Sequence, residues 1–169
     1  MWIQVSESLP AGISLKEALT ELQPLCEENE VFLIADSDVE LAKDMRIHGV
    51  HLKKGDMKPA EARELLGPHA VIGVDVNSAA DILSLKGQDI DYAVLDFDGE
   101  QSIPRITEII KEVNADGMEI HIVARGMMSL ADMTELQKAG VNGFALSRQI
   151  IDAADPVTAT ADILKALGR

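Results

Sequence analysis

The sequence predicts an α/β fold made of strand–helix units, with parallel strands buried beneath helices. Short runs rich in Val, Ile and Leu, apolar on both faces, alternate with amphipathic stretches along the whole chain. Runs of this kind are typical of strands covered on both faces, as in parallel sheets. The unit recurs seven times, and no linker or low-complexity segment interrupts it. This repetition indicates either a doubly wound sheet or a barrel, and a barrel needs eight strands.

The predicted strands are the seven short apolar runs. They are Ile3–Val5, Val31–Ala35, Gly49–Leu52, Ala70–Val74, Tyr92–Leu95, Ile120–Ala124 and Gly143–Leu146. Each is followed by a stretch with apolar residues at helical spacing. The unbroken alternation predicts a single domain over residues 1–169.

Capping residues indicate where the helices begin. Ser14-Leu15-Lys16-Glu17 forms a capping box. The helix that it opens is expected to bury the side that carries Leu15, Leu19, Leu22 and Leu25. Cys26 falls at helical spacing from this side, so we expect it to be a small core residue. The other predicted helix starts are Asp38, Pro59, Ser78, Ser102, Ser129 and Asp155-Pro156.

The composition excludes several classes of function. Of 169 residues, 47% are hydrophobic and 26% charged, and the formal charge is −14. A surface this acidic repels phosphate backbones and anionic lipids, so neither nucleic acid nor a membrane surface is an expected partner. No apolar run approaches the roughly 20 residues of a membrane helix, and the first residues do not form a signal-peptide pattern. The one cysteine excludes an internal disulfide, and we expect a soluble, cytoplasmic protein.

Acidic residues follow most of the predicted strands. Five of the seven carboxyl ends carry them, as Glu7, Asp36, Asp56, Asp75 and the pair Asp96 and Asp98. In parallel α/β folds these ends form the face that binds ligands. Each aspartate can cap the following helix, or several can converge on a divalent cation that prefers oxygen ligands. Spacing alone leaves both interpretations open.

Several segments resemble the thiamine-phosphate synthase family, and they occur in the same order. Phe32-Leu33-Ile34-Ala35-Asp36 followed by Val39-Glu40-Leu41-Ala42 is similar to its segment fliiND…vdLA. Gly49-Val50-His51-Leu52, with Asp56 four residues on, resembles DGVHLGQxD. Gly140–Ser147 resembles the family's last strand and the serine after it, and Trp2-Ile3-Gln4-Val5 resembles its second strand. The resemblance covers almost the whole chain and extends to the related thiazole tautomerases.

This resemblance implies a TIM-type (β/α) barrel whose first β-α unit is missing. The family joins hydroxymethylpyrimidine pyrophosphate to thiazole phosphate and releases pyrophosphate, with Mg²⁺ and basic residues stabilising the leaving group. The implied magnesium ligands are Asp36 and Asp56. The implied substrate-binding residues are Gln4 and His51 at the pyrimidine and pyrophosphate site, Asp75 in place of a serine that faces the pyrophosphate, and Gly126 with Ser147 at the thiazole phosphate.

The chain departs from the family at several basic positions. Ser6 and Ser8 stand in place of an arginine and a lysine, and a Thr-x-Thr-Lys loop is absent after Asp98. At about 1–3 kcal/mol for each charge-assisted contact, three lost groups amount to about 3–9 kcal/mol. Partial compensation requires that Lys53, Lys54, Arg125 and Arg148 point into the site. We interpret the two lysines as ordinary surface charge, so inefficient synthesis is expected.

Two functions therefore stay open. One is a Mg²⁺-dependent transferase of the thiamine-phosphate synthase type, favoured by the retained Asp36 and Asp56. The other is a catalytically silent relative that holds a small molecule of the thiamine pathway, or a full-length synthase, in its acidic mouth. The lost basic groups favour this second function. A thiazole tautomerase is disfavoured, because Asn77 replaces a histidine and an amide cannot shuttle protons at neutral pH.

The missing first unit also leads to an expectation about assembly. Seven strands leave the edges of Ile3–Val5 and Val141–Leu146 without a neighbour, or close at a non-standard size. A second copy that covers these edges is expected, which predicts a homo-oligomer. A truncated chain that opens into a partial barrel is the alternative.

Overall fold

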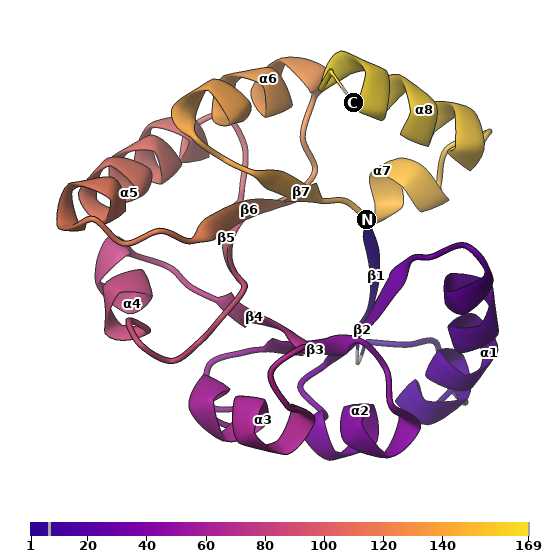
Figure 1. The fold of residues 1–169 in the computed structure, drawn as a ribbon. Coiled ribbons are helices and arrows are strands. Elements are labelled where there is room, and N and C mark those ends of the chain that lie inside the picture. The colour runs from indigo at the N-terminus through magenta and orange to yellow at the C-terminus, as the bar shows by residue number, and fades with distance from the viewer. Residues whose placement is uncertain (7, 169) are drawn as a thin grey trace. The chain divides into compact units, whose positions relative to one another are not determined.

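The computed structural model describes residues 1–6 and 8–168, and it has the strand–helix alternation that the sequence predicts (Figure 1). The strands are β1 (Trp2–Val5), β2 (Phe32–Asp36), β3 (Gly49–Leu52), β4 (Val71–Asp75), β5 (Tyr92–Phe97), β6 (His121–Gly126) and β7 (Gly143–Ala145). The helices are α1 (Leu15–Glu28), α2 (Val39–Met45), α3 (Pro59–Leu66), α4 (Ala79–Ser84), α5 (Ser102–Asp116), α6 (Leu130–Ala139), α7 (Arg148–Ile151) and α8 (Pro156–Ala166). All seven predicted strands are confirmed, with ends shifted by at most two residues. Glu7 lies outside the described residues.

The chain divides into two compact units, which are described separately. The first contains Met1–Asp75 and Gly87–Asp91, and the second contains Val76–Lys86 and Tyr92–Arg169. The single domain over residues 1–169 stays a prediction. None of the helices within residues 1–6 and 8–168 has the length and hydropathy needed to cross a membrane.

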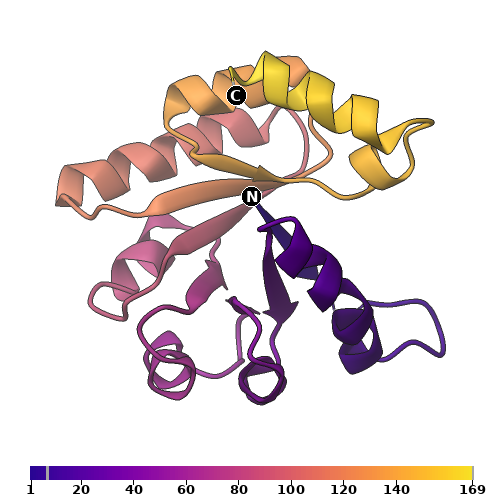
Figure 2. The same cartoon turned by 45° about the vertical axis from the view of Figure 1, so that its right-hand side comes forward.

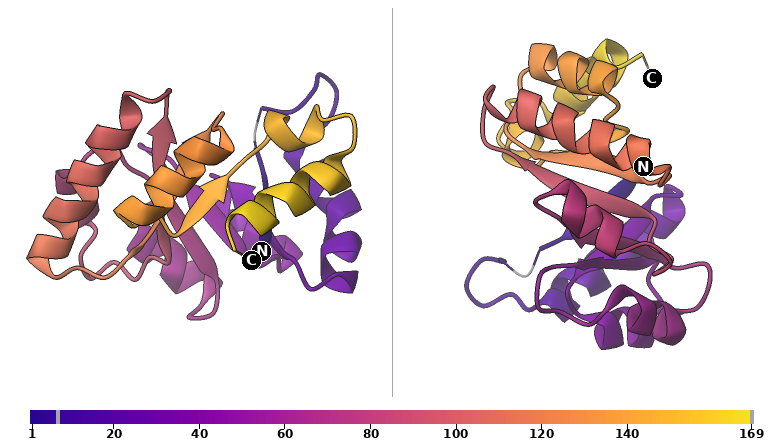
Figure 3. Two further views of the ribbon diagram at one scale, coloured as in Figure 1. Left: turned by 90° about the horizontal axis from the view of Figure 1, so that it is seen from above. Right: turned by 90° about the vertical axis from the view of Figure 1, so that its left-hand side faces the viewer.

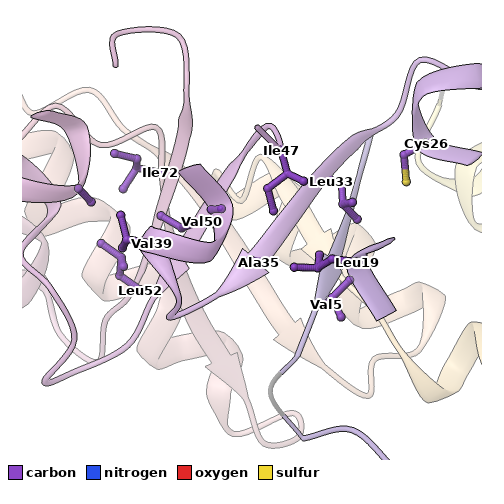
Figure 4. Packing of buried hydrophobic residues seen from close by; sticks show 12 residues of the cluster. Val5, Leu19, Cys26, Leu33, Ala35, Val39, Ile47, Val50, Leu52 and Ile72 are labelled. Carbon is purple, nitrogen blue, oxygen red and sulfur yellow. The ribbon is translucent and has the colours of Figure 1, made fainter. Parts of the chain in front are cut away.

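In the first unit, β1 to β4 pair in parallel and in chain order, with α1 to α3 along one face (Figure 1). Successive side chains of a strand point to opposite faces. The face toward the helices buries a continuous apolar cluster, shown in Figure 4, that includes Val5, Leu19, Cys26, Leu33, Ala35, Val50, Leu52 and Ile72. Burial raises the pKa of the Cys26 thiol. The opposite face is left for Gln4, Asp36, His51 and Asp75.

Helix α1 begins with the predicted capping box, because the Ser14 hydroxyl accepts from the Glu17 amide and the Glu17 carboxylate accepts from the Ser14 amide. Its predicted buried side is wrong at one position, since Leu25 is 56% exposed. At about 100° per residue, Leu25 lies roughly a third of a turn around the helix from Leu19. Cys26 falls on the side of Leu19 instead and is buried, as predicted.

The other predicted helix starts are confirmed except one. Asp38, Ser78, Ser129 and Asp155 are N-caps, and Pro59 opens α3. Ser102, predicted as a cap, is the first helical residue, and Gln101 holds the cap position. The buried Ser102 hydroxyl instead accepts from the backbone amide of Asp98 at 2.9 Å, which ties the loop after β5 to the helix.

The second unit is built from β5 to β7, again parallel and in chain order. Helices α5 and α6 lie side by side in Figures 2 and 3 and are in contact, and α8 packs against α6 and α7. Their buried side chains include Ile106, Ile110, Met133 and Leu136. As expected, the chain passes from β5 into α5 after a short loop.

Candidate functional site

Four of the predicted site residues share one face of strands β1 to β4 in the first unit. The β2–β3 register places Asp36 opposite His51. Gln4 pairs with Ile34, two residues before Asp36, and Asp75 comes two residues after the partner of His51. Because side chains alternate along a strand, all four point away from the helices. The sequence-predicted residues of this unit are therefore brought together at the carboxyl ends of its strands.

Asp36 is the most enclosed carboxylate of this group, with a side chain only 4% exposed. Gln4 Nε2 donates a hydrogen bond to its Oδ1 at 2.5 Å. Lys53 Nζ lies 3.0 Å from its Oδ2. A buried carboxylate is costly unless it is paired and hydrogen-bonded, and both conditions are met here by residues of the same unit.

Lys53 was expected on the surface, and that interpretation is wrong. Its side chain is 35% exposed, and its ammonium lies on the buried carboxylate of Asp36. Lys54 is exposed, as predicted. The position of Lys53 in the sequence could have indicated this contact. Lys53 directly follows β3, and Asp36, at the end of the neighbouring strand β2, is buried and needs a counter-charge.

Asp56 contacts the same lysine through the backbone. Its Oδ2 accepts from the Lys53 amide at 2.7 Å, and its own amide donates to the Lys53 carbonyl at 3.1 Å. Gly55, between them, has φ of +101°, a conformation that favours glycine. Asp56 thus closes the four-residue turn that follows β3 and fixes the start of the loop.

His51 and Asp75 form a second pair on this face. Nε2 of the fully buried His51 lies 2.7 Å from Oδ1 of Asp75, whose side chain is 24% exposed. An ionised carboxylate only accepts hydrogen bonds, so with Asp75 ionised Nε2 of His51 is the donor of this pair. The pair holds the imidazole in a fixed orientation, with the partly exposed carboxylate of Asp75 beside it.

The strand-end aspartates were interpreted either as helix caps or as cation ligands. The cap interpretation is wrong for Asp36, Asp75 and Asp96, since the caps of the helices that follow them are Asp38, Ser78 and Gln101. Each instead contacts a basic side chain at its own end of the sheet. These three strand-end carboxylates are therefore paired with basic side chains of the same chain.

The magnesium site expected at Asp36 and Asp56 stays a prediction, but its donor set can be compared with what Mg²⁺ requires. Mg²⁺ takes oxygen ligands at about 2.0–2.1 Å in near-octahedral geometry. Within the described part of the chain, no group of three or more His, Cys, Asp or Glu side chains is arranged to hold a metal ion. Both oxygens of Asp36 already accept from nitrogen donors. As arranged here, the two aspartates do not fit a Mg²⁺ ion.

The strand ends of the second unit carry a more open ion pair. Arg125 Nε and Nη2 lie 2.8 and 2.7 Å from Oδ1 of Asp96. Arg105 Nη2 donates to the Asp96 carbonyl at 2.6 Å and extends the cluster. The side chains of Asp96 and Arg125 are 50% and 33% exposed. The positive charge of Arg125, considered above as compensation for lost basic groups, is therefore matched by an adjacent carboxylate.

Gly126 and Ser147, expected at a phosphate, both belong to the second unit. Gly126 ends β6 with φ of +151°, and a Cβ there would lie 2.4 Å from the carbonyl oxygen of Phe97. The close approach of β5 is a backbone reason for glycine at this position. Ser147 is exposed at the cap position of α7, and its side chain makes no capping hydrogen bond. Phosphate binding by these two residues stays a prediction.

The fold and the strand-end site define the class: a TIM-type α/β protein with its polar groups at the carboxyl ends of parallel strands. The thiamine phosphate pyrophosphorylase from Pyrococcus furiosus superposes with a TM-score of 0.80 over 98% of this chain and 81% of that one, at 23% identity. The orotidine 5′-phosphate decarboxylase from Pyrococcus horikoshii superposes with a TM-score of 0.73 over 99% of this chain and 87% of that one, at 17% identity. At these identities the likeness shows the fold alone.

Sequence comparison identifies the family. The family model described as thiamine monophosphate synthase matches residues 1–150. The thiamine-phosphate synthase of Bacteroides fragilis is 34% identical, over 96% of this chain and 85% of its own length, and that of Bacteroides thetaiotaomicron is 32% identical over 96% and 83%. The chain belongs to the thiamine monophosphate synthase family. The resemblance read from the sequence is confirmed, and so is a place in thiamine biosynthesis.

Proposed function

We propose that this chain joins hydroxymethylpyrimidine pyrophosphate to thiazole phosphate and releases pyrophosphate. The observation that carries the proposal is the convergence of Gln4, Asp36 and His51 on one face of the sheet, at the ends of three strands. The similarity to two synthases, over 85% and 83% of their own lengths, supports it. The enzyme would be a transferase.

The reaction breaks the bond between the pyrimidine methylene carbon and the pyrophosphate oxygen, which departs with the electron pair. The thiazole nitrogen then forms a bond to that carbon. Most of the barrier falls when the charge on the leaving group is neutralised. Lys53 is the cation of the first unit placed for this role, and Gln4 and His51 offer hydrogen bonds to the pyrimidine and the pyrophosphate. Asp75 orients His51.

The direct test is product formation from the two precursors, followed by chromatography. The wild-type chain is expected to form thiamine phosphate and one pyrophosphate per product. His51→Asn is expected to lower the rate at least tenfold, because one charge-assisted contact is worth about 1.5–3 kcal/mol. The control is Lys54→Gln, an exposed residue with no assigned role. No product with either Mg²⁺ or EDTA present would reject the proposal.

A second function is favoured by the pairing of charges. Asp36 with Lys53 and Asp96 with Arg125 are each neutralised inside the chain, and Asp75 is already paired with His51. A catalytically silent relative that binds a thiamine-pathway molecule would have this arrangement. Titration calorimetry with each precursor separates the two functions: saturable binding without turnover supports the silent relative. A tautomerase stays disfavoured because Asn77 is an exposed amide.

We also propose a cytoplasmic homo-oligomer in which a second copy covers β1. This strand is the first in the strand order and pairs with β2, and Trp2 and Ile3 on it are 38% and 41% exposed. Edge strands with exposed apolar side chains favour pairing with another chain. Light scattering coupled to size exclusion tests this. A monomer at micromolar concentration would reject it.

A further inference from the structure

The buried carboxylate of Asp36 creates a demand for positive charge in the first unit. Its side chain is 4% exposed, and Gln4, on its Oδ1, is neutral and cannot offset the charge. Lys53 Nζ, 3.0 Å from Oδ2, supplies a unit charge. A divalent cation is therefore not needed to make this carboxylate stable where it lies.

One residue contacts both aspartates that were expected to bind a metal. The ammonium of Lys53 contacts Asp36, and the backbone amide of Lys53 donates to Oδ2 of Asp56 at 2.7 Å. Lys53 directly follows Leu52, which is 1% exposed and packed in the core cluster. The backbone of Lys53 is thus fixed by β3 on one side and by the turn to Asp56 on the other.

An ammonium and a magnesium ion cannot share this arrangement. Mg²⁺ would need to approach Asp36 Oδ2 to about 2.1 Å, beside an ammonium already 3.0 Å from the same atom. The two cations would repel each other, and one must leave. The similar family segment, DGVHLGQxD, has glycine where this chain has Lys53, so the cation is a departure of this sequence.

We infer that Lys53 is the resident cation of this site and takes the place of a divalent cation at Asp36 and Asp56. Its ligand is the pyrophosphate group of a phosphate ester, met directly by the ammonium. The inference about the ligand rests on the proposed function, whereas the inference about the metal does not. A single ammonium carries half the charge of Mg²⁺, so binding of the anion is weaker than in a site that uses the metal.

The first experiment measures metal binding without any substrate. Mn²⁺, a paramagnetic substitute for Mg²⁺, is titrated into the wild-type chain, Lys53→Met and Lys54→Met, and free Mn²⁺ is followed by electron paramagnetic resonance. Wild type and Lys54→Met are expected to show the same weak, unsaturated binding. Lys53→Met, which frees Asp36, is expected to bind at least fivefold more tightly, and Asp36→Asn added to it should abolish the gain.

Two outcomes would overturn the inference about the metal. One is saturable Mn²⁺ binding by the wild-type chain that Asp36→Asn removes. The other is a folded Lys53→Met chain, by circular dichroism, with unchanged Mn²⁺ affinity. If Lys53→Met does not fold, the wild-type titration with and without Asp36→Asn still decides between the two cations.

The second experiment titrates inorganic pyrophosphate in the presence of EDTA. Binding to wild type is expected without metal, and Lys53→Met is expected to weaken it about tenfold, while Lys54→Met leaves it within twofold. Pyrophosphate binding that appears only with Mg²⁺ would overturn the inference about the ligand. Loss of product formation alone rejects the proposed function and leaves the Mn²⁺ result standing, so the two failures are distinguishable.

Discussion

The two units place charged side chains at equivalent points, the carboxyl ends of parallel strands, but they enclose them differently. In the first unit, His51 is fully buried and the Asp36 side chain is 4% exposed. In the second, the side chains of Asp96 and Arg125 are 50% and 33% exposed. Ion pairs near water gain little because the solvent screens them, whereas buried charges depend on their partners. We therefore expect the charged side chains at the strand ends to be held in one arrangement in the first unit and to be free to adjust in the second.

The glycines that begin β3 and β7 differ in how closely the neighbouring strand approaches them, and this difference gives the largest expected effect. Gly49 and Gly143 each begin a strand. A Cβ on Gly49 would lie 1.9 Å from the carbonyl oxygen of Val71, but on Gly143 it would lie 3.5 Å from the nearest atom, Val123 Cγ2, an ordinary contact. Gly49→Ala is expected to lower the free energy of unfolding by about 3 kcal/mol or more, because β3 and β4 must separate.

Gly143→Ala is the matched control, with a change of at most about 1 kcal/mol and in the stabilising direction. Urea unfolding followed by circular dichroism measures both. A Gly49→Ala chain within 1 kcal/mol of wild type would contradict the close packing of β3 on β4.

The two paired carboxylates, Asp75 and Asp96, give an intermediate effect and test the comparison directly. Asp75→Asn leaves the buried His51 without its charged acceptor and is expected to cost about 1.5–3 kcal/mol. Asp96→Asn removes an exposed pair with Arg125 and is expected to cost about 0.2–1 kcal/mol. Double-mutant cycles with His51→Asn and Arg125→Gln isolate each pair. Equal coupling energies would show that the difference in exposure has no energetic consequence.

The sequence predicted most of the fold because the deciding signals are local. Apolar runs fixed all seven strands, and capping residues such as Ser14 and Asp155 fixed the helix starts. The two errors concern the exposure of Leu25 and the cap position of α5, and both depend on three-dimensional geometry that the local pattern does not specify. Leu25 lies about a third of a turn from the buried Leu19, and the hydroxyl of Ser102 accepts a hydrogen bond from the Asp98 amide instead of capping the helix.

The sequence was enough to predict which residues belong to the site, but not which of them contact one another. Resemblance named Gln4, Asp36 and His51, and strand alternation is enough to place them on one face. The partner of His51 is 24 residues away in sequence, and no local pattern pairs them. Lys53 was missed because its long side chain can reach either solvent or Asp36, a choice that depends on the burial of a residue on the neighbouring strand.

The smallest effect concerns the exposed helix caps, where the two units should behave alike. Backbone and side-chain hydrogen bonds from Ser14 lower the pKa of Glu17 below its ordinary 4.5, and hydrogen bonds from Thr158 and Val157 lower the pKa of Asp155 below 3.8. A carboxyl group with a lowered pKa in the folded state stabilises the fold above its ordinary pKa. That stability is lost as the pH falls through the folded value.

Glu17→Gln and Asp155→Asn should therefore lower the urea midpoint at pH 7 and lose this deficit on acidification, starting near pH 4.5 for Glu17 and near pH 3.8 for Asp155. The measurement is the urea midpoint of each variant and of wild type from pH 7 to pH 3. A difference in urea midpoint that does not change with pH would mean that the charge of the capping carboxylates does not contribute to stability. Similar small deficits in α1 and α8 would confine the difference between the units to their strand ends, because only there does burial remove the solvent that screens the charges.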